Sequence, residues 1–213
     1  MSVKLMLADR AKEGGWWHFV PDSLVAWDQR AYDHLVGGNR QSTLYWFADQ
    51  MAHRWLGIVL LLVALGALLG LSYRRHRSRK ALAFELIFFL VLVGVGNILS
   101  DELKRLFARL KPHVSMDIAG AKQPLSFPSN HSFNTATILG FWAIALWGID
   151  KLSWMMAIVS LTVIWAFTAW TRVYLGEHFP LDVAGGFFFG ILYGFYGAWL
   201  LTLVRQWLGK RAH

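Results

Sequence analysis

Five long apolar runs constrain the fold of this chain more than any other feature of the sequence. They cover residues 55–73, 81–99, 133–147, 152–170 and 183–204. Each is close to the roughly 20 residues that an α-helix needs to cross the hydrocarbon core of a bilayer, and the third is the shortest. Apolar residues make up 56% of the 213 residues, and the mean hydropathy is +0.40. The sequence therefore predicts an all-α fold, a polytopic transmembrane bundle of about five spanning helices.

A soluble all-helical enzyme is the alternative to a membrane protein. The surface helices of such an enzyme carry a polar stripe. Residues 58–71 and 86–95 contain no polar side chain, which favours the membrane. The length predicts a single domain over residues 1–213, with the helical bundle at residues 53–208.

The distribution of positive charge predicts how the bundle is oriented. The densest basic cluster is the short segment 74–80 between the first two runs, and the positive-inside rule assigns it to the cytoplasm. By alternation, residues 100–132 and 171–182 face outward, which in a bacterial inner membrane is the periplasm. The outer loop breaks the rule with five cations: Lys104, Arg105, Arg109, Lys111 and Lys122. An anionic substrate or lipid headgroups would account for positive charge on that side.

The first 52 residues contain no apolar run of spanning length. Leu24, Trp27, Ala31 and Leu35 recur at helical spacing between charged residues, which predicts an amphipathic helix lying on the outer membrane surface. The segment lacks the short apolar core and cleavage site of a removable signal peptide. It could form a rim or lid over the site, or simply pack against the bundle, and the sequence leaves both open.

The first motif that carries chemistry is Lys104 followed by Lys111 and Pro112. The two lysines are seven residues apart, about two helical turns, so they point the same way if one helix carries both as far as Pro112. A basic turn beside a membrane can also be no more than an interfacial anchor.

The second motif is the segment 126–132, which precedes an apolar helix. Ser129 or Asn130 is a natural helix N-cap, and the free backbone N–H groups at a helix start favour an anion. His131 then falls in the first turn, over that site. The alternative is a capping serine with a histidine there by chance.

The third motif places His178 six residues after Arg172 and four before Asp182. An arginine can hold two phosphate oxygens in a bidentate fork. His178 can act as a nucleophile, with Asp182 accepting a hydrogen bond from its other ring nitrogen. Pro180 suits the first turn of the following helix. Together these residue types indicate phosphate chemistry.

In this order, the three motifs resemble the signature of the type-2 phosphatidic acid phosphatase superfamily: KxxxxxxRP, PSGH and SRxxxxxHxxxD. The resemblance extends over about residues 81–204. Three positions differ, because Lys111 replaces an arginine, Asn130 a glycine and Thr171 a serine. The lysine keeps the charge but loses the bidentate fork. Membrane members usually have six spans, and here the amphipathic segment stands in place of the first.

The resemblance implies a role for each site residue. His178 attacks phosphorus to give a phosphohistidine, His131 protonates the leaving oxygen and later activates water, and Asp182 orients His178. The groups implied to bind the substrate phosphate are Lys104, Lys111, Ser129, Asn130 and Arg172. No cluster of carboxylates offers a metal site, so we expect neither a metal nor another cofactor.

The expected partners are a lipid phosphate and the surrounding membrane lipids, not nucleic acid. The candidate substrates are undecaprenyl diphosphate, phosphatidylglycerol phosphate or phosphatidic acid, and a lipid A phosphate. One rival is a phosphotransferase that passes the phosphoryl group to an acceptor lipid. Another is a catalytically silent membrane binding protein, which the complete set of reactive residues disfavours. Soluble haloperoxidases share the signature and bind vanadate, but the apolar runs disfavour that chemistry. The oligomeric state stays open.

Overall fold

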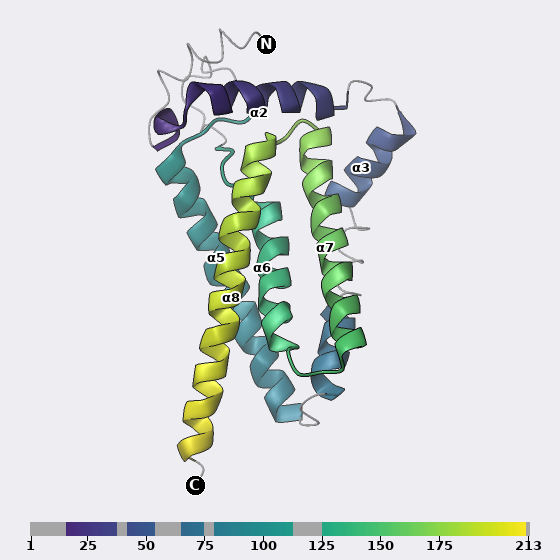
Figure 1. The fold of residues 1–213 in the computed structure, drawn as a ribbon, viewed down its shortest axis with the longest axis vertical. Coiled ribbons are helices and arrows are strands. Elements are labelled where there is room, and N and C mark those ends of the chain that lie inside the picture. Colours follow the sequence, from purple (N-terminus) through teal and green to yellow (C-terminus); the bar gives the residue numbers. More distant parts are fainter. Residues whose placement is uncertain (1–15, 38–41, 54–64, 75–78, 113–124, 212–213) are drawn as a thin grey trace.

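Long helices run side by side along the molecule, and one helix lies across an end of the bundle (Figure 1). The computed structural model describes residues 16–37, 42–53, 65–74, 79–112 and 125–211. The elements are η1 (Trp16–Phe19), α2 (Asp22–Leu35), α3 (Thr43–His53), α5 (Arg79–Phe107), α6 (Asn130–Ala145), α7 (Lys151–Tyr174) and α8 (Pro180–Arg211). Residues 65–74 are also helical. Within these ranges, β-structure is limited to a bridge between Leu110 and Leu125, so the predicted all-α class is confirmed.

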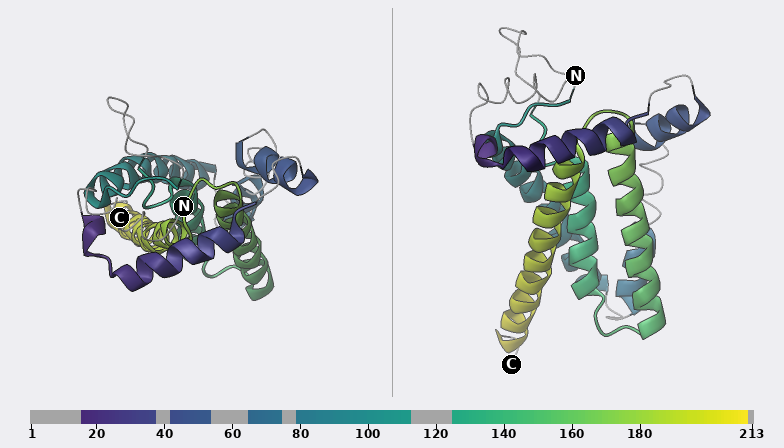
Figure 2. Two further views of the ribbon diagram at one scale, coloured as in Figure 1. Left: turned by 90° about the horizontal axis from the view of Figure 1, so that it is seen from above. Right: turned by 45° about the horizontal axis from the view of Figure 1, so that its top comes forward.

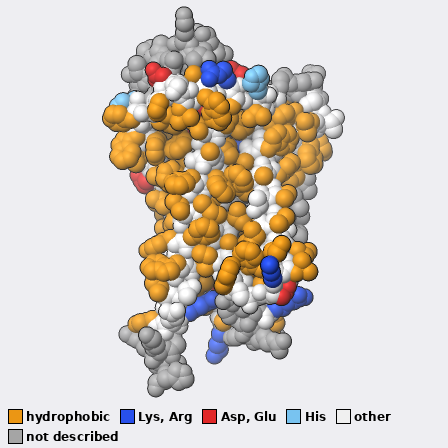
Figure 3. Space-filling model, in the orientation of Figure 1, with side chains coloured by type: hydrophobic (Ala, Val, Ile, Leu, Met, Phe, Trp, Pro, Cys, Tyr) orange, Lys and Arg blue, Asp and Glu red, His pale blue; other side chains and the backbone are white. Residues whose placement is uncertain are grey.

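Three helices are long and apolar enough to cross a membrane. They provide the stretches Lys80–Phe107, Lys151–Tyr174 and Pro180–Trp207. The space-filling view shows hydrophobic side chains over the middle of the bundle and charged side chains toward its two ends (Figure 3). The prediction of a transmembrane helical bundle is confirmed. Of the two other expected spans, α6 has 16 residues, and most of residues 55–73 lie outside the described ranges.

Helices α6 and α8 pack with their backbones in close contact. Gly186, Gly190 and Gly194 recur every fourth residue, so they lie on one face of α8. A Cβ atom at each position would meet a backbone carbonyl oxygen of α6, in turn those of Ser129, Phe133 and Thr137. At Gly186 that distance would be 2.6 Å. Small residues at this spacing allow close helix approach in membranes, and here they fix the start of α6 beside the start of α8.

The N-terminal helix α2 lies roughly perpendicular to the long helices and packs against α7 and α8 (Figure 2). The face that packs inward contains Val25, Asp28, Gln29 and Tyr32. The expected apolar stripe points elsewhere, since Leu24, Trp27 and Leu35 are 40%, 50% and 47% exposed. The helix is amphipathic as predicted, and it packs on the bundle while leaving an apolar face uncovered.

Helix α5 ends earlier than the first motif suggested. Ala108 has a φ of 53°, in the left-handed region that often closes a helix, and its amide donates to the carbonyl of Lys104 at 2.8 Å. The expected continuation to Pro112 is therefore wrong, and Lys111 lies beyond the helix. The break turns the next residue, Arg109, into the interior, where it is 1% exposed.

The other end of the bundle carries the α6–α7 turn and the end of α8 (Figure 1). Asp150 caps α7 there, because its Oδ1 accepts a hydrogen bond from the Ser153 amide at 2.9 Å. That bond holds the pKa of Asp150 below its usual value. All three sequence motifs lie at the opposite end, under α2.

Candidate active site

Four helix ends meet beneath α2. Because successive helices reverse direction, the last turns of α5 and α7 lie beside the first turns of α6 and α8 (Figure 1). The first motif starts in the last turn of α5 and continues beyond its end, the second begins α6, and the third connects α7 to α8. The fold therefore gathers the three motifs into one region.

His178 and Asp182 form the pair that their spacing predicts. Helix α7 closes at Gly176, whose φ of 79° favours glycine, and the His178 amide then donates to the Arg172 carbonyl at 3.2 Å. Pro180 begins α8 and brings Asp182 back toward the turn. The His178 Nδ1 lies 3.4 Å from the Asp182 Oδ2, and the two residues are 4% and 0% exposed.

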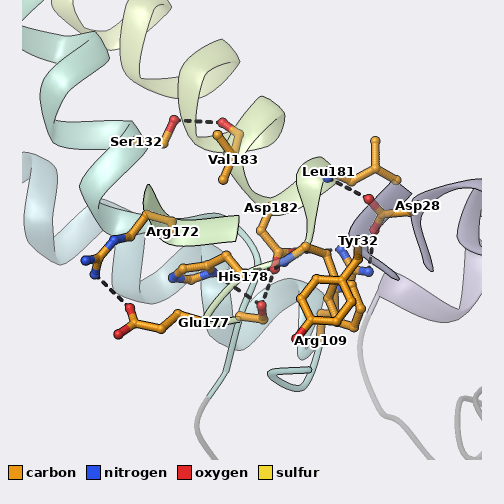
Figure 4. A network of polar contacts seen from close by, with 12 residues as sticks. Asp28, Tyr32, Arg109, Ser132, Arg172, Glu177, His178, Leu181, Asp182 and Val183 are labelled. Carbon is orange, nitrogen blue, oxygen red and sulfur yellow. Dashed lines mark hydrogen bonds and ion pairs between the residues drawn. The ribbon is translucent and has the colours of Figure 1, made fainter. Parts of the chain in front are cut away.

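Both oxygens of the Asp182 carboxylate are held by other groups (Figure 4). Oδ2 accepts from the Phe179 amide at 2.9 Å and from the Ser126 hydroxyl. Oδ1 accepts from Nη1 of Arg109 at 2.6 Å. The Ser126 hydroxyl oxygen is also 3.4 Å from Nδ1 of His178. These contacts leave the carboxylate little freedom to rotate away from the imidazole.

Arg109 connects this carboxylate to the N-terminal helix. Its Nη2 donates to Oδ2 of Asp28 at 2.5 Å, and its guanidinium lies 4.0 Å from the ring centroids of both Trp17 and Phe179. Asp28 is 0% exposed, and its second oxygen accepts from the Leu181 amide at 2.8 Å. Burial raises the pKa of Asp28, an effect that the adjacent guanidinium opposes.

Ser126, Arg109 and Asp28 are the site residues that the sequence analysis missed. Asp28 shares a helical face with Val25 and Tyr32. This spacing indicates that α2 has a second face, but it does not indicate that this face is buried. Arg109 was one of five cations in the outer loop, with no pattern to separate it from the others.

Arg172 and Ser129 are among the buried side chains that have donor or acceptor atoms without a hydrogen-bond partner among the described residues. Nη1 of Arg172 donates to Glu177 at 2.7 Å, whereas its Nε and Nη2 have no such partner. The same holds for the hydroxyl of Ser129, the N-cap of α6, which makes no capping hydrogen bond. The Ser129 amide donates to the Asp182 carbonyl at 2.9 Å, which keeps this helix start beside the His–Asp pair. Unsatisfied buried donors are costly, and both a guanidinium and the start of a helix suit a bound anion.

The two lysines of the first motif differ in their surroundings. Lys104 is in the last turn of α5, with Nζ 4.0 Å from the Asp101 carboxylate. Its charge also interacts with those of Asp182 and Lys111. Lys111 is partly exposed in the segment that follows. Lys104 is thus close enough to interact with both Asp182 and Lys111, although the two lysines are not carried by one helix.

The two remaining predicted site residues begin α6. The Asn130 side chain faces α5, where its Oδ1 accepts from the Ser100 hydroxyl at 2.6 Å and its Nδ2 donates to Asp101 at 3.2 Å. The Asn130 side chain is therefore engaged by α5. His131 is exposed in the first turn of the helix. Among the residues that the structure describes, no group of three or more His, Cys, Asp or Glu side chains could hold a metal.

Fold and site together describe a membrane-embedded helical protein with a buried histidine–aspartate pair beside a cluster of cations. A family model of the PAP2 superfamily matches residues 84–209, and the chain belongs to this superfamily. The resemblance inferred from the three motifs is thereby confirmed.

Two curated proteins and one solved structure illustrate the relationship. Phosphatidylglycerophosphatase B of Bacillus subtilis (strain 168) is 32% identical over 111 residues, which cover 50% of this chain and 53% of that protein. The lipid A 4'-phosphatase of Bacteroides thetaiotaomicron is 24% identical over 181 residues, covering 78% of this chain and 73% of that protein. This chain thus spans about half the length of the first relative. The crystal structure of a transmembrane PAP2-type phosphatidylglycerolphosphate phosphatase from Bacillus subtilis has the same fold, with a TM-score of 0.61, 22% identity and coverage of 96% of this chain and 94% of that one.

Proposed function

We propose that this protein is a membrane lipid phosphate phosphatase that hydrolyses a phosphomonoester or diphosphate of a lipid. The observation that carries the proposal is the buried contact between His178 Nδ1 and Asp182 Oδ2, 3.4 Å apart. The His178 amide also donates to the carbonyl of Arg172, whose Nε and Nη2 have no partner among the described residues. The two curated relatives, one named for phosphatidylglycerophosphate and one for lipid A phosphate, support a lipid substrate.

In the proposed reaction, Nε2 of His178 attacks phosphorus and the bond to the leaving oxygen breaks, giving a phosphohistidine. Asp182 accepts the hydrogen bond from Nδ1–H, which fixes the tautomer and stabilises the positive charge that develops on the ring. His131 donates a proton to the leaving oxygen. It then takes a proton from water, which attacks the phosphohistidine, so that inorganic phosphate leaves and His178 is restored.

Fixed positive charge does most of the catalytic work in this mechanism. Phosphoryl transfer needs little covalent chemistry beyond the nucleophile, so positioning and electrostatic stabilisation dominate the rate. The groups proposed to hold the equatorial oxygens are Lys104, Lys111, Arg172, the hydroxyl of Ser129 and the backbone amide of Asn130. Since these cations supply the charge that a divalent metal would bring, the proposed reaction needs no metal ion.

Apolar side chains cover the middle of the bundle on the face that Figure 3 shows, so a lipid substrate can keep its tails in the bilayer while its phosphate reaches the α2 end. We propose that this end faces the periplasm of a bacterial inner membrane. The substrate candidates are undecaprenyl diphosphate, phosphatidylglycerol phosphate or phosphatidic acid, and a lipid A phosphate. A phosphotransferase built on the same phosphohistidine is the second candidate function.

Purified protein is expected to release inorganic phosphate from at least one of these lipids in excess EDTA. Vanadate should inhibit, because its trigonal bipyramid resembles the transferring phosphoryl group. A phosphate assay of each lipid in detergent micelles, with and without an acceptor lipid, measures both properties. Product that forms only with the acceptor would favour the phosphotransferase. Loss of activity in EDTA with recovery in magnesium would refute the metal-independent mechanism, and release from none of the lipids would favour a silent binding protein.

The proposed orientation can be tested because the chain contains no cysteine. Glu102, with a side chain 58% exposed, lies at the α2 end, and the exposed Lys151 lies at the other end. In intact cells, a membrane-impermeant maleimide should label Glu102→Cys. It should label Lys151→Cys only after the membrane is permeabilised. The reverse labelling pattern would place the site in the cytoplasm.

A further inference from the structure

Asp28, on the N-terminal helix, is joined to the His178–Asp182 pair through one arginine. We propose that Asp28 and Arg109 are positioning residues: α2 holds the arginine, the arginine holds the Asp182 carboxylate, and the carboxylate orients the His178 imidazole. This inference rests on the proposed function, in which His178 is the nucleophile. It gives the N-terminal helix a part in the reaction without contact with the substrate.

The arginine bridges the two carboxylates with one terminal nitrogen each. Nη1 lies 2.6 Å from Asp182 Oδ1, and Nη2 lies 2.5 Å from Asp28 Oδ2. Each carboxylate is also bound to a backbone amide near the start of α8, Asp28 to that of Leu181 at 2.8 Å and Asp182 to that of Phe179 at 2.9 Å. Helix α2, the segment after α5 and the first turn of α8 are thus closed into one ring of hydrogen bonds (Figure 4).

Burial makes this ring rigid. Arg109 is 1% exposed, and the two aspartates are 0% exposed. Water therefore has little access to replace a lost contact, and a charged group without its partner would stay desolvated. The guanidinium plane is further restrained by the rings of Trp17 and Phe179, each 4.0 Å away. A planar group held at both terminal nitrogens and stacked on aromatic rings has few alternative orientations.

The ring of hydrogen bonds orients His178, the proposed nucleophile. Phe179 directly follows His178, so one segment supplies the nucleophile, a stacking ring and an amide donor to Asp182. The groups proposed to hold the phosphate are outside the ring. Loss of the Asp28 contact should therefore affect the attack on phosphorus more than the binding of phosphate.

Formation of the phosphoenzyme tests this inference directly. In a rapid-quench experiment with ³²P-labelled phosphatidylglycerol phosphate in excess over protein, the rate constant of the burst reports orientation, whereas its amplitude reports the fraction of active molecules. Asp28→Asn should lower the rate constant about ten- to a hundredfold, the order of loss expected from a small misplacement of a reacting group. The amplitude and the concentration of inorganic phosphate that gives half inhibition should stay within about twofold of wild type.

Asp33→Asn is the matched control, because Asp33 is on the same helix but exposed, and its side chain accepts a hydrogen bond from Gln29 of that helix at 2.7 Å. Its rate constant should equal that of wild type. Arg109→Lys provides a second variant, since an ammonium acts as a point charge and does not reproduce the fork. Its rate constant should also fall at preserved amplitude.

Two results would overturn the inference in different ways. If Asp28→Asn and Arg109→Lys lose amplitude but keep the wild-type rate constant, the ring only stabilises the fold. If wild-type protein forms no labelled enzyme from this lipid or from the other candidates, the proposed function fails and the inference fails with it.

Discussion

Phosphate release by the His178→Ala variant is expected to fall to background while the protein keeps its fold. The loss should exceed the roughly hundred- to thousandfold that removal of one charge-stabilising donor costs, because no other described group is placed to form the covalent intermediate. The fold should survive, since Asp182 keeps its contacts with Phe179, Ser126 and Arg109. The measurement is inorganic phosphate released from the lipid that the wild type hydrolyses, together with circular dichroism and a melting curve.

His34→Ala is the control for this prediction, because His34 is exposed near the end of α2. Its phosphate release should match that of wild type. A His178→Ala variant that releases phosphate at a comparable rate would exclude this histidine as the nucleophile.

Gly190→Leu is expected to cause the largest loss of stability. A Cβ at Gly190 would meet the Phe133 carbonyl oxygen, and it would lie 3.0 Å from the Ala136 Cβ. Helices α6 and α8 must then move apart, and overpacking of this kind costs about 1–3 kcal/mol or more. For a chain of this size, that corresponds to a melting temperature lowered by about 2–12 °C. Thermal unfolding in a single detergent, followed by circular dichroism, measures the shift.

Gly94→Leu is the matched control, because a Cβ at Gly94 would have no other heavy atom within 4 Å. Its melting temperature should stay near that of wild type. Equal stability of the two leucine variants would mean that α6 and α8 are not in close contact. The Gly190 variant should also lose activity, since the two helices keep Ser129 beside Asp182.

The architecture could be predicted from the sequence because its signals are local. A run of apolar residues such as 81–99 is visible without knowledge of its neighbours, and α5 contains all of it. The pairing of His178 with Asp182 was predictable for the same reason, since four residues separate them. The amphipathic character of α2 was also predictable, because it follows from the spacing of apolar residues within that segment alone.

The ring around Arg109 was not predictable, because it depends on contacts between distant segments. The break after α5 falls on Ala108, a residue with high helix propensity that gives no signal for a left-handed conformation. Asp28 is 81 residues from Arg109 in the sequence. Its position on an amphipathic helix showed that α2 has two faces, but only the packed structure shows which one faces the site.

The short central helix sets the depth at which the reaction takes place. At 1.5 Å per residue, the 16 residues of α6 span about 24 Å, less than the roughly 30 Å of a bilayer core. The proposed catalytic groups at its start therefore lie close to the level of the lipid headgroups, and a lipid substrate could reach them by lateral diffusion without leaving the membrane. For such an enzyme, the substrate concentration that determines the rate is the surface concentration within the membrane. Turnover should follow the mole fraction of substrate in the bilayer, and dilution with inert lipid should slow it even at constant bulk concentration.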